Sequence, residues 1–109
     1  MSLPSGYYLT KFRTPLDEAG GVIMVDGDTV FGGDSAMYYR GEITAETRVI
    51  VVKLRVRQHD ETRMSVFGDY DDFTLTLEGR KQGGIYVFEG RADRAPSLRF
   101  EATLAPAPD

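Results

Sequence analysis

The segment that decides the fold is VIVVKLRVR, residues 49–57. Apolar and charged side chains alternate along it, with Ile50, Val52, Leu54 and Val56 set against Lys53, Arg55 and Arg57. Successive side chains of a β-strand point to opposite faces of the sheet. The alternation therefore predicts a strand with one buried and one solvated face, which is typical of antiparallel sheets.

The same alternation recurs toward the C-terminus in FTLTLE, residues 73–78, and in LRFEATL, residues 98–104. No segment supplies the helices that a parallel sheet needs between its strands. Turn signals separate the apolar runs: Asp26-Gly27 in VDGDT, Gly83-Gly84 in RKQGGIY and a looser turn in ADRAPS. Such turns between apolar runs indicate β-hairpins.

This punctuation divides the chain into eight predicted strands, at about 6–13, 20–26, 28–32, 37–44, 47–57, 72–79, 84–91 and 97–104. A twisted sheet of this size tends to curl, and closure removes its unpaired edges. We therefore predict an all-β fold: a small eight-stranded antiparallel up-and-down β-barrel, with a sandwich as the alternative. Residues 1–109 form a single domain, and residues 1–5 and 105–109 are expected to be frayed.

Composition limits the function. The net charge of −4 disfavours non-specific binding to nucleic acid, which depends on clustered cations. The chain has no cysteine, and no apolar run approaches the length that spans a bilayer. The first residues, MSLPSGYYLTKFRT, lack a hydrophobic segment of signal-peptide length, so we expect a cytoplasmic protein.

A second stretch, VFGGDSAMYYRG at residues 30–41, raises the question of a phosphate-binding loop. It lacks the lysine of such loops and leads into a strand, which argues against that role. We expect Gly32 and Gly33 to allow either a positive φ or close packing at a strand junction, and Asp34 to accept backbone N–H groups. With Gly41, these residues form a structural motif, from which Tyr39 enters the interior.

Catalytic and metal-binding groups are sparse. His59 is the one histidine, and Ser35 or Ser65 would serve as a nucleophile only if the fold brought it alongside. The run DYDD at residues 69–72 lacks the ligand spacing of a calcium loop. We therefore predict no enzymatic activity, no metal and no cofactor. The cations Lys53, Arg55 and Arg57, with Arg48 and Arg63 nearby, either meet an acidic partner or a phosphate backbone, or simply keep strands from self-association.

The segment from Gln58 to Asp72 is too long for a hairpin, and it is either a plug over one barrel end or a surface crossover. The barrel interior is either a packed core or a site for one small apolar ligand. Its predicted inward residues are Tyr8, Phe12, Val22, Met24, Tyr39, Ile50, Val52, Leu54, Phe73, Leu75, Leu77, Tyr86, Phe88 and Phe100.

Two stretches, GYYLTKF at residues 6–12 and GGVIMVDGDTVFGGDSAMYYRG at residues 20–41, resemble the GrlR family of negative regulators of type III secretion. Members of that family similarly begin with a G-x-Y strand and carry a glycine-flanked hairpin that leads to GGD and then Tyr-x-Gly. The resemblance extends loosely through residues 49–77, and the last third of the chain matches only in strand rhythm. It implies a lipocalin-like eight-stranded barrel with a hydrophobic interior, a plug-like loop and a dimeric state.

The role that this resemblance implies is to bind and restrain a transcriptional activator. The activator-binding member carries Glu-Asp-Glu-Asp after the Tyr-x-Gly strand, where this chain has Ala45, Glu46, Thr47 and Arg48. Glu46 alone keeps its charge and is the candidate partner-binding residue. We therefore predict a regulatory or binding domain that acts through protein contact as a homodimer, with Val49 and Val51 as candidate contact residues. The alternative is a carrier or sensor of a small apolar molecule in the barrel.

Overall fold

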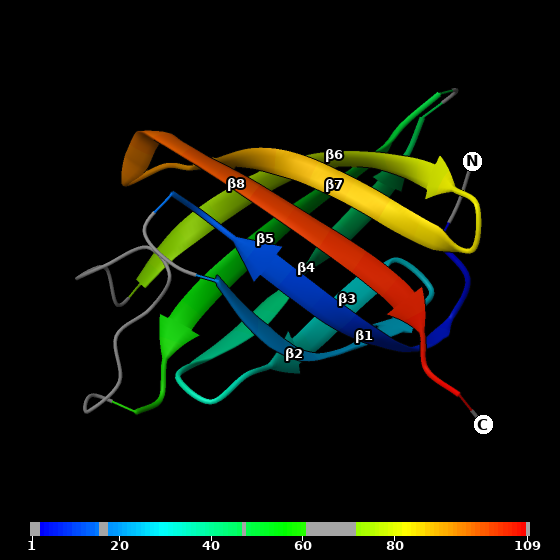
Figure 1. The fold of residues 1–109 in the computed structure, drawn as a ribbon, viewed down its shortest axis with the longest axis horizontal. Helices are drawn as coiled ribbons and strands as arrows, with labels where there is room; N and C mark the ends of the chain where they lie inside the picture. The colour runs from blue at the N-terminus through cyan, green and yellow to red at the C-terminus, as the bar shows by residue number, and fades with distance from the viewer. Residues whose placement is uncertain (1–2, 16–17, 47, 61–71, 109) are drawn as a thin grey trace.

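The structure is a computed structural model that describes residues 3–15, 18–46, 48–60 and 72–108. Eight strands, and no helix, occur in these residues (Figure 1). Their bounds are β1 Gly6–Arg13, β2 Glu18–Asp26, β3 Thr29–Gly33, β4 Met37–Ala45, β5 Ile50–Gln58, β6 Asp72–Gln82, β7 Ile85–Ala92 and β8 Ala95–Pro106.

Each strand pairs in antiparallel fashion with the next, and β8 returns to pair with β1 (Figure 1). The sheet is thus a closed up-and-down barrel, which confirms the predicted fold class. At the closing seam Phe12 is paired with Ala102 and Arg13 with Glu101. The Arg13 guanidinium donates to Glu101 Oε2 at 3.0 and 2.8 Å on the outer surface.

Two hairpins form where the sequence predicts them, although the first turn is at Gly27 and Asp28, one residue after the predicted Asp26-Gly27. Asp26 pairs with Thr29 and Gln82 with Ile85, so each hairpin has a two-residue loop. Gly27 and Gly83 open these loops with φ of 61° and 63°, a conformation that side chains other than hydrogen disfavour. Asp93 and Arg94 form the third loop, in which Asp93 Oδ1 accepts the Thr74 N–H at 2.8 Å.

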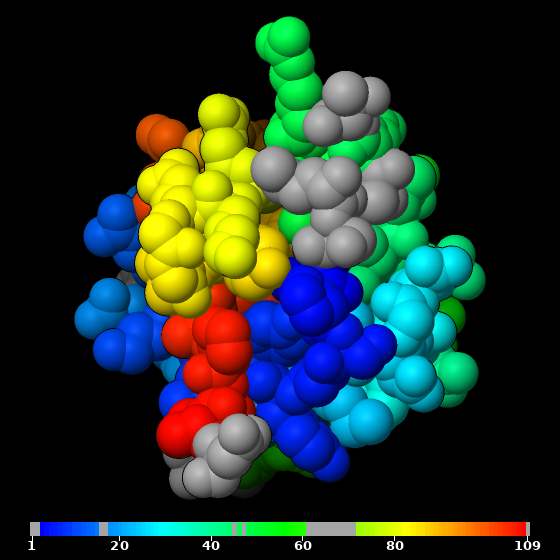
Figure 2. Space-filling model, turned by 90° about the vertical axis from the view of Figure 1, so that its right-hand side faces the viewer, coloured from blue at the N-terminus to red at the C-terminus, as the bar shows by residue number. Residues whose placement is uncertain are grey.

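The described residues 3–5 and 105–106 differ from the expectation of fraying at the two termini. Leu3 is buried, and Ser5 Oγ accepts the Gly27 N–H at 3.0 Å. Figure 2 shows this end of the barrel with N-terminal residues, in blue, at its centre. At the other terminus β8 continues to Pro106, because Ala105 pairs with Leu9 of the seam.

The burial pattern corrects the predicted face of β2. Ile23 and Val25 are buried, whereas Val22 is 47% exposed and Met24 lies outside the core. Both faces of this strand carry apolar side chains, so its sequence does not show which face turns inward. The other predicted inward residues are buried, and together they form the core on the inner side of the barrel.

Candidate ligand cavity in the barrel interior

The barrel interior contains a cavity of about 430 Å³. All eight strands contribute to its lining, which is mostly aliphatic and aromatic. A barrel of eight strands is just wide enough either to be filled by its own side chains or to hold one small ligand. The volume lies within the range of sites for small molecules.

Most residues of the predicted interior line this cavity: Phe12, Tyr39, Val52, Leu54, Leu75, Leu77, Phe88 and Phe100. Tyr8, Ile50, Phe73 and Tyr86 are buried but do not line it, and Val22 and Met24 lie outside the core. The lining also includes residues that the sequence did not predict, among them Ile23, Val30, Met37 and Thr10. Strict alternation in β1 between Tyr8 and Phe12 would have placed Thr10 inside.

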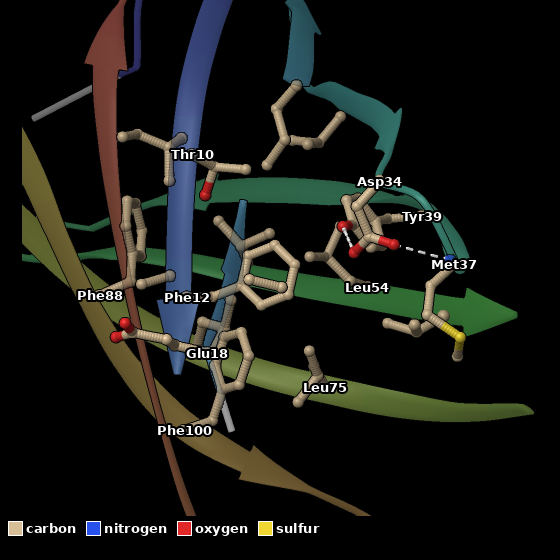
Figure 3. Close-up of a pocket in the computed structure, with 18 of the residues that line it drawn as sticks. Thr10, Phe12, Glu18, Asp34, Met37, Tyr39, Leu54, Leu75, Phe88 and Phe100 are labelled. Carbon is tan, nitrogen blue, oxygen red and sulfur yellow. Dashed lines mark hydrogen bonds between the residues drawn. The ribbon is translucent and has the colours of Figure 1, made fainter. Parts of the chain in front are cut away.

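Aromatic rings form one part of the wall (Figure 3). The Phe12 ring meets the Tyr39 ring edge to face, with centroids 6.0 Å apart and planes at 89°. On its other side the Phe12 ring lies 5.8 Å from that of Phe100 at 31°. These contacts join β1 with β4 and β8, so side chains distant in sequence make a continuous surface for an apolar ligand.

Asp34 organises the turn between β3 and β4 at one end of the cavity. Its Oδ1 accepts the backbone N–H groups of Ala36 at 2.8 Å and Met37 at 2.7 Å, and its Oδ2 accepts the Tyr39 hydroxyl (Figure 3). The prediction that Asp34 accepts nearby N–H groups is confirmed. Burial, followed by the hydrogen bond to Asp34, raises the pKa of Tyr39 well above its usual range. Tyr39 therefore stays a neutral donor at physiological pH.

The glycines of the motif serve close packing rather than a positive φ. No positive φ is found at Gly32, Gly33 or Gly41. A Cβ on Gly32 would collide with the Val22 carbonyl oxygen, and one on Gly41 with that of Lys53. Of the two predicted roles for the glycines of GGD, close packing is therefore the correct one.

His59 follows β5 and contacts the Asp34 turn instead of a nucleophile. Its backbone N–H donates to the Ala36 carbonyl at 2.8 Å. Its Nε2 lies 2.8 Å from the Asp34 carbonyl oxygen, which can only accept, so Nε2 carries the proton. The Ser35 side chain is exposed, and no hydrogen bond joins it to His59 in the described residues. Ser65, Arg63, most of DYDD and most of the predicted plug lie outside the described residues.

The outer surface has two distinct areas. An outer apolar face is formed on β1–β4 by exposed large side chains: Tyr7, Leu9, Val22, Phe31 and Tyr38. Beyond it, β5 presents Lys53 and Arg55 to solvent, and Arg55 pairs with Asp72 at 3.1 and 3.0 Å.

The three earlier candidates for contact residues lie away from the outer apolar face. Val49 and Val51 are half-buried and so offer less apolar surface than that face does. Glu46 is exposed in the turn between β4 and β5, where its N–H donates to the Val49 carbonyl at 2.9 Å.

No family model matches the chain, and a comparison with curated proteins likewise finds no match. Within the described ranges, no group of three or more histidine or acidic side chains is arranged to hold a metal ion. The same residues contain no helix long and apolar enough to cross a membrane.

Proposed function

We propose that this protein is a non-enzymatic binding domain that holds one small apolar molecule inside its barrel. The observation that carries the proposal is the cavity of about 430 Å³, which all eight strands line. A fully packed barrel of this size has little internal space, because protein interiors are packed as closely as organic crystals. Burial of apolar ligand surface against this wall contributes about 25 cal/mol per Å² to binding.

The test is titration with the neutral apolar fluorophore N-phenyl-1-naphthylamine. We expect saturable binding to the protein, and loss of that binding in Leu54→Trp, because the indole fills the cavity beside Leu75. Lys53→Trp is the matched control, since it adds the same ring to the outer face of the same strand. Equal binding by both variants, with both folded by circular dichroism, would contradict an internal site.

A second role, regulation through protein contact, is supported by the outer apolar face. Its side chains are well exposed, with Tyr7 at 61% and Leu9 at 49%. Contiguous apolar surface on a small protein is often an interaction site. Together with the resemblance to the GrlR family, this face favours a cytoplasmic homodimer in which β1–β4 of two copies meet. The two roles are compatible, because one uses the interior and the other the exterior.

Sedimentation equilibrium tests the second role. We expect a dimer for the unmodified protein and a monomer for Leu9→Glu, because a carboxylate would lose its hydration in the contact. Thr76→Glu adds the same charge to the exposed face of β6 and should remain a dimer. A monomeric unmodified protein would contradict the dimer.

A further inference from the structure

The polar groups of the cavity limit the chemistry of its ligand. Among the described lining residues, the side chains that carry oxygen are Thr10, Glu18, Asp34, Ser35 and Tyr39. None of the described lining residues is a lysine, arginine or histidine. The described part of the cavity wall therefore offers hydroxyls and carboxylates but no cationic side chain.

Thr10 is the least exposed of these polar residues. It lies on the inner face of β1 between Tyr8 and Phe12, and the residue is only 3% exposed. Figure 3 shows its side chain among the apolar residues that line the cavity. No hydrogen bond of its hydroxyl is found in the described part of the chain. The hydroxyl oxygen itself is not fully buried and faces the cavity, so a ligand group that pairs with it would gain affinity.

Asp34 supplies negative charge to another part of the cavity lining. Its carboxylate accepts two backbone N–H groups and the Tyr39 hydroxyl, all of which are uncharged donors. No ion pair of Asp34 is found among the described residues. Glu18 also lines the cavity, but it is an exposed residue whose charge lies close to that of Arg13. The Asp34 carboxylate is therefore the charge of this lining that bears on a ligand, and it favours nearby cations and opposes nearby anions.

We propose that the ligand is an apolar molecule whose polar group is a hydroxyl or an amine, and that the cavity rejects carboxylates such as fatty acids. The polar group pairs with the Thr10 hydroxyl, which both donates and accepts a hydrogen bond. A carboxylate would instead lose its hydration in an apolar cavity that Asp34 also lines, without a cationic partner from the described lining. This inference rests on the proposed function, because it describes the occupant of the same cavity.

Three probes with the same alkyl chain test the inference: 1-decanol, decylamine and decanoate. Each competes at pH 7 for the site of N-phenyl-1-naphthylamine, where the amine is cationic and the carboxylate anionic. We expect displacement by 1-decanol and decylamine, and at least about tenfold weaker displacement by decanoate. If all three compounds displaced the fluorophore equally well, the inference about the polar group of the ligand would be wrong, while the proposed function would stand. Failure of the fluorophore itself to bind would overturn both.

Variants connect the selectivity with particular residues. Thr10→Val removes the hydroxyl with little change in shape, and should weaken 1-decanol about tenfold, whereas Thr10→Ser should retain its affinity. Asp34→Asn keeps an oxygen acceptor for the turn but removes the charge, and should improve decanoate several-fold relative to 1-decanol. Unchanged affinities in both Thr10→Val and Asp34→Asn, with the fold intact by circular dichroism, would overturn the inference.

Discussion

At the scale of single residues, Asp34 is the side chain that connects the GGD motif with the interior. Asp34→Ala would leave the Ala36 and Met37 N–H groups and the partly buried Tyr39 hydroxyl without their acceptor. We expect it to lower the free energy of unfolding by about 2–3 kcal/mol, measured by urea denaturation. Asp26→Ala, at an exposed position beside a two-residue turn, should change it by less than about 0.5 kcal/mol. An equal loss in the free energy of unfolding for both variants would contradict a stabilising role of the Asp34 hydrogen bonds.

Tyr39 gives a second prediction at this scale, on alkaline pH. Its pKa is raised above the ordinary value of 10.0, chiefly by burial. Stability from the neutral phenol is therefore fully present below pH 10 and is lost as the pH rises above it, by at most about 1.4 kcal/mol per pH unit. Urea denaturation across this range should show a shallower decline for Tyr39→Phe. A residual slope is expected, because burial also raises the pKa of Tyr8. An identical slope in Tyr39→Phe would contradict the prediction.

At the scale of elements, the buried face of β2 is determined by the strands with which it pairs, because apolar side chains alternate on both of its faces. Ile23 is buried, while Val22 and Met24 face outward. We expect Ile23→Ala to lower the free energy of unfolding by about 2–4 kcal/mol, and Val22→Ala by less than about 1 kcal/mol. Chemical denaturation of the two variants measures the difference, and a larger effect for Val22→Ala would restore the face that the sequence predicts.

At the scale of the whole molecule, the seam between β1 and β8 closes the barrel with both a surface ion pair and a buried contact. Phe12 packs on Tyr39 and Phe100 inside, whereas Arg13 pairs with Glu101 in solvent. We expect Phe12→Ala to lower the free energy of unfolding by about 3 kcal/mol. Arg13→Ala should leave it almost unchanged, because exposed ion pairs contribute little. Thermal denaturation of both variants tests this, and a larger loss in Arg13→Ala would mean that the ion pair closes the barrel.

Much of the fold follows from local patterns in the sequence. Alternation in β5 and β6 determines which side chains turn inward, because the period of a strand is two residues. Gly27 and Gly83 determine two hairpins, because each turn needs a positive φ that glycine adopts at little cost. These features predict antiparallel strands in sequence order. The GGD stretch likewise predicts Asp34 as the acceptor of backbone N–H groups in the turn that follows.

Tertiary structure alone decided three other features. The face of β2 depends on its pairing with β1 and β3, because apolar side chains occupy both of its faces. The length of β8 depends on β1, which pairs with Ala105 and Pro106 although the two strands lie at opposite ends of the chain. The cavity depends on how closely side chains from eight strands meet at the barrel axis. A sequence specifies which residues turn inward, but empty volume is a property of their joint packing.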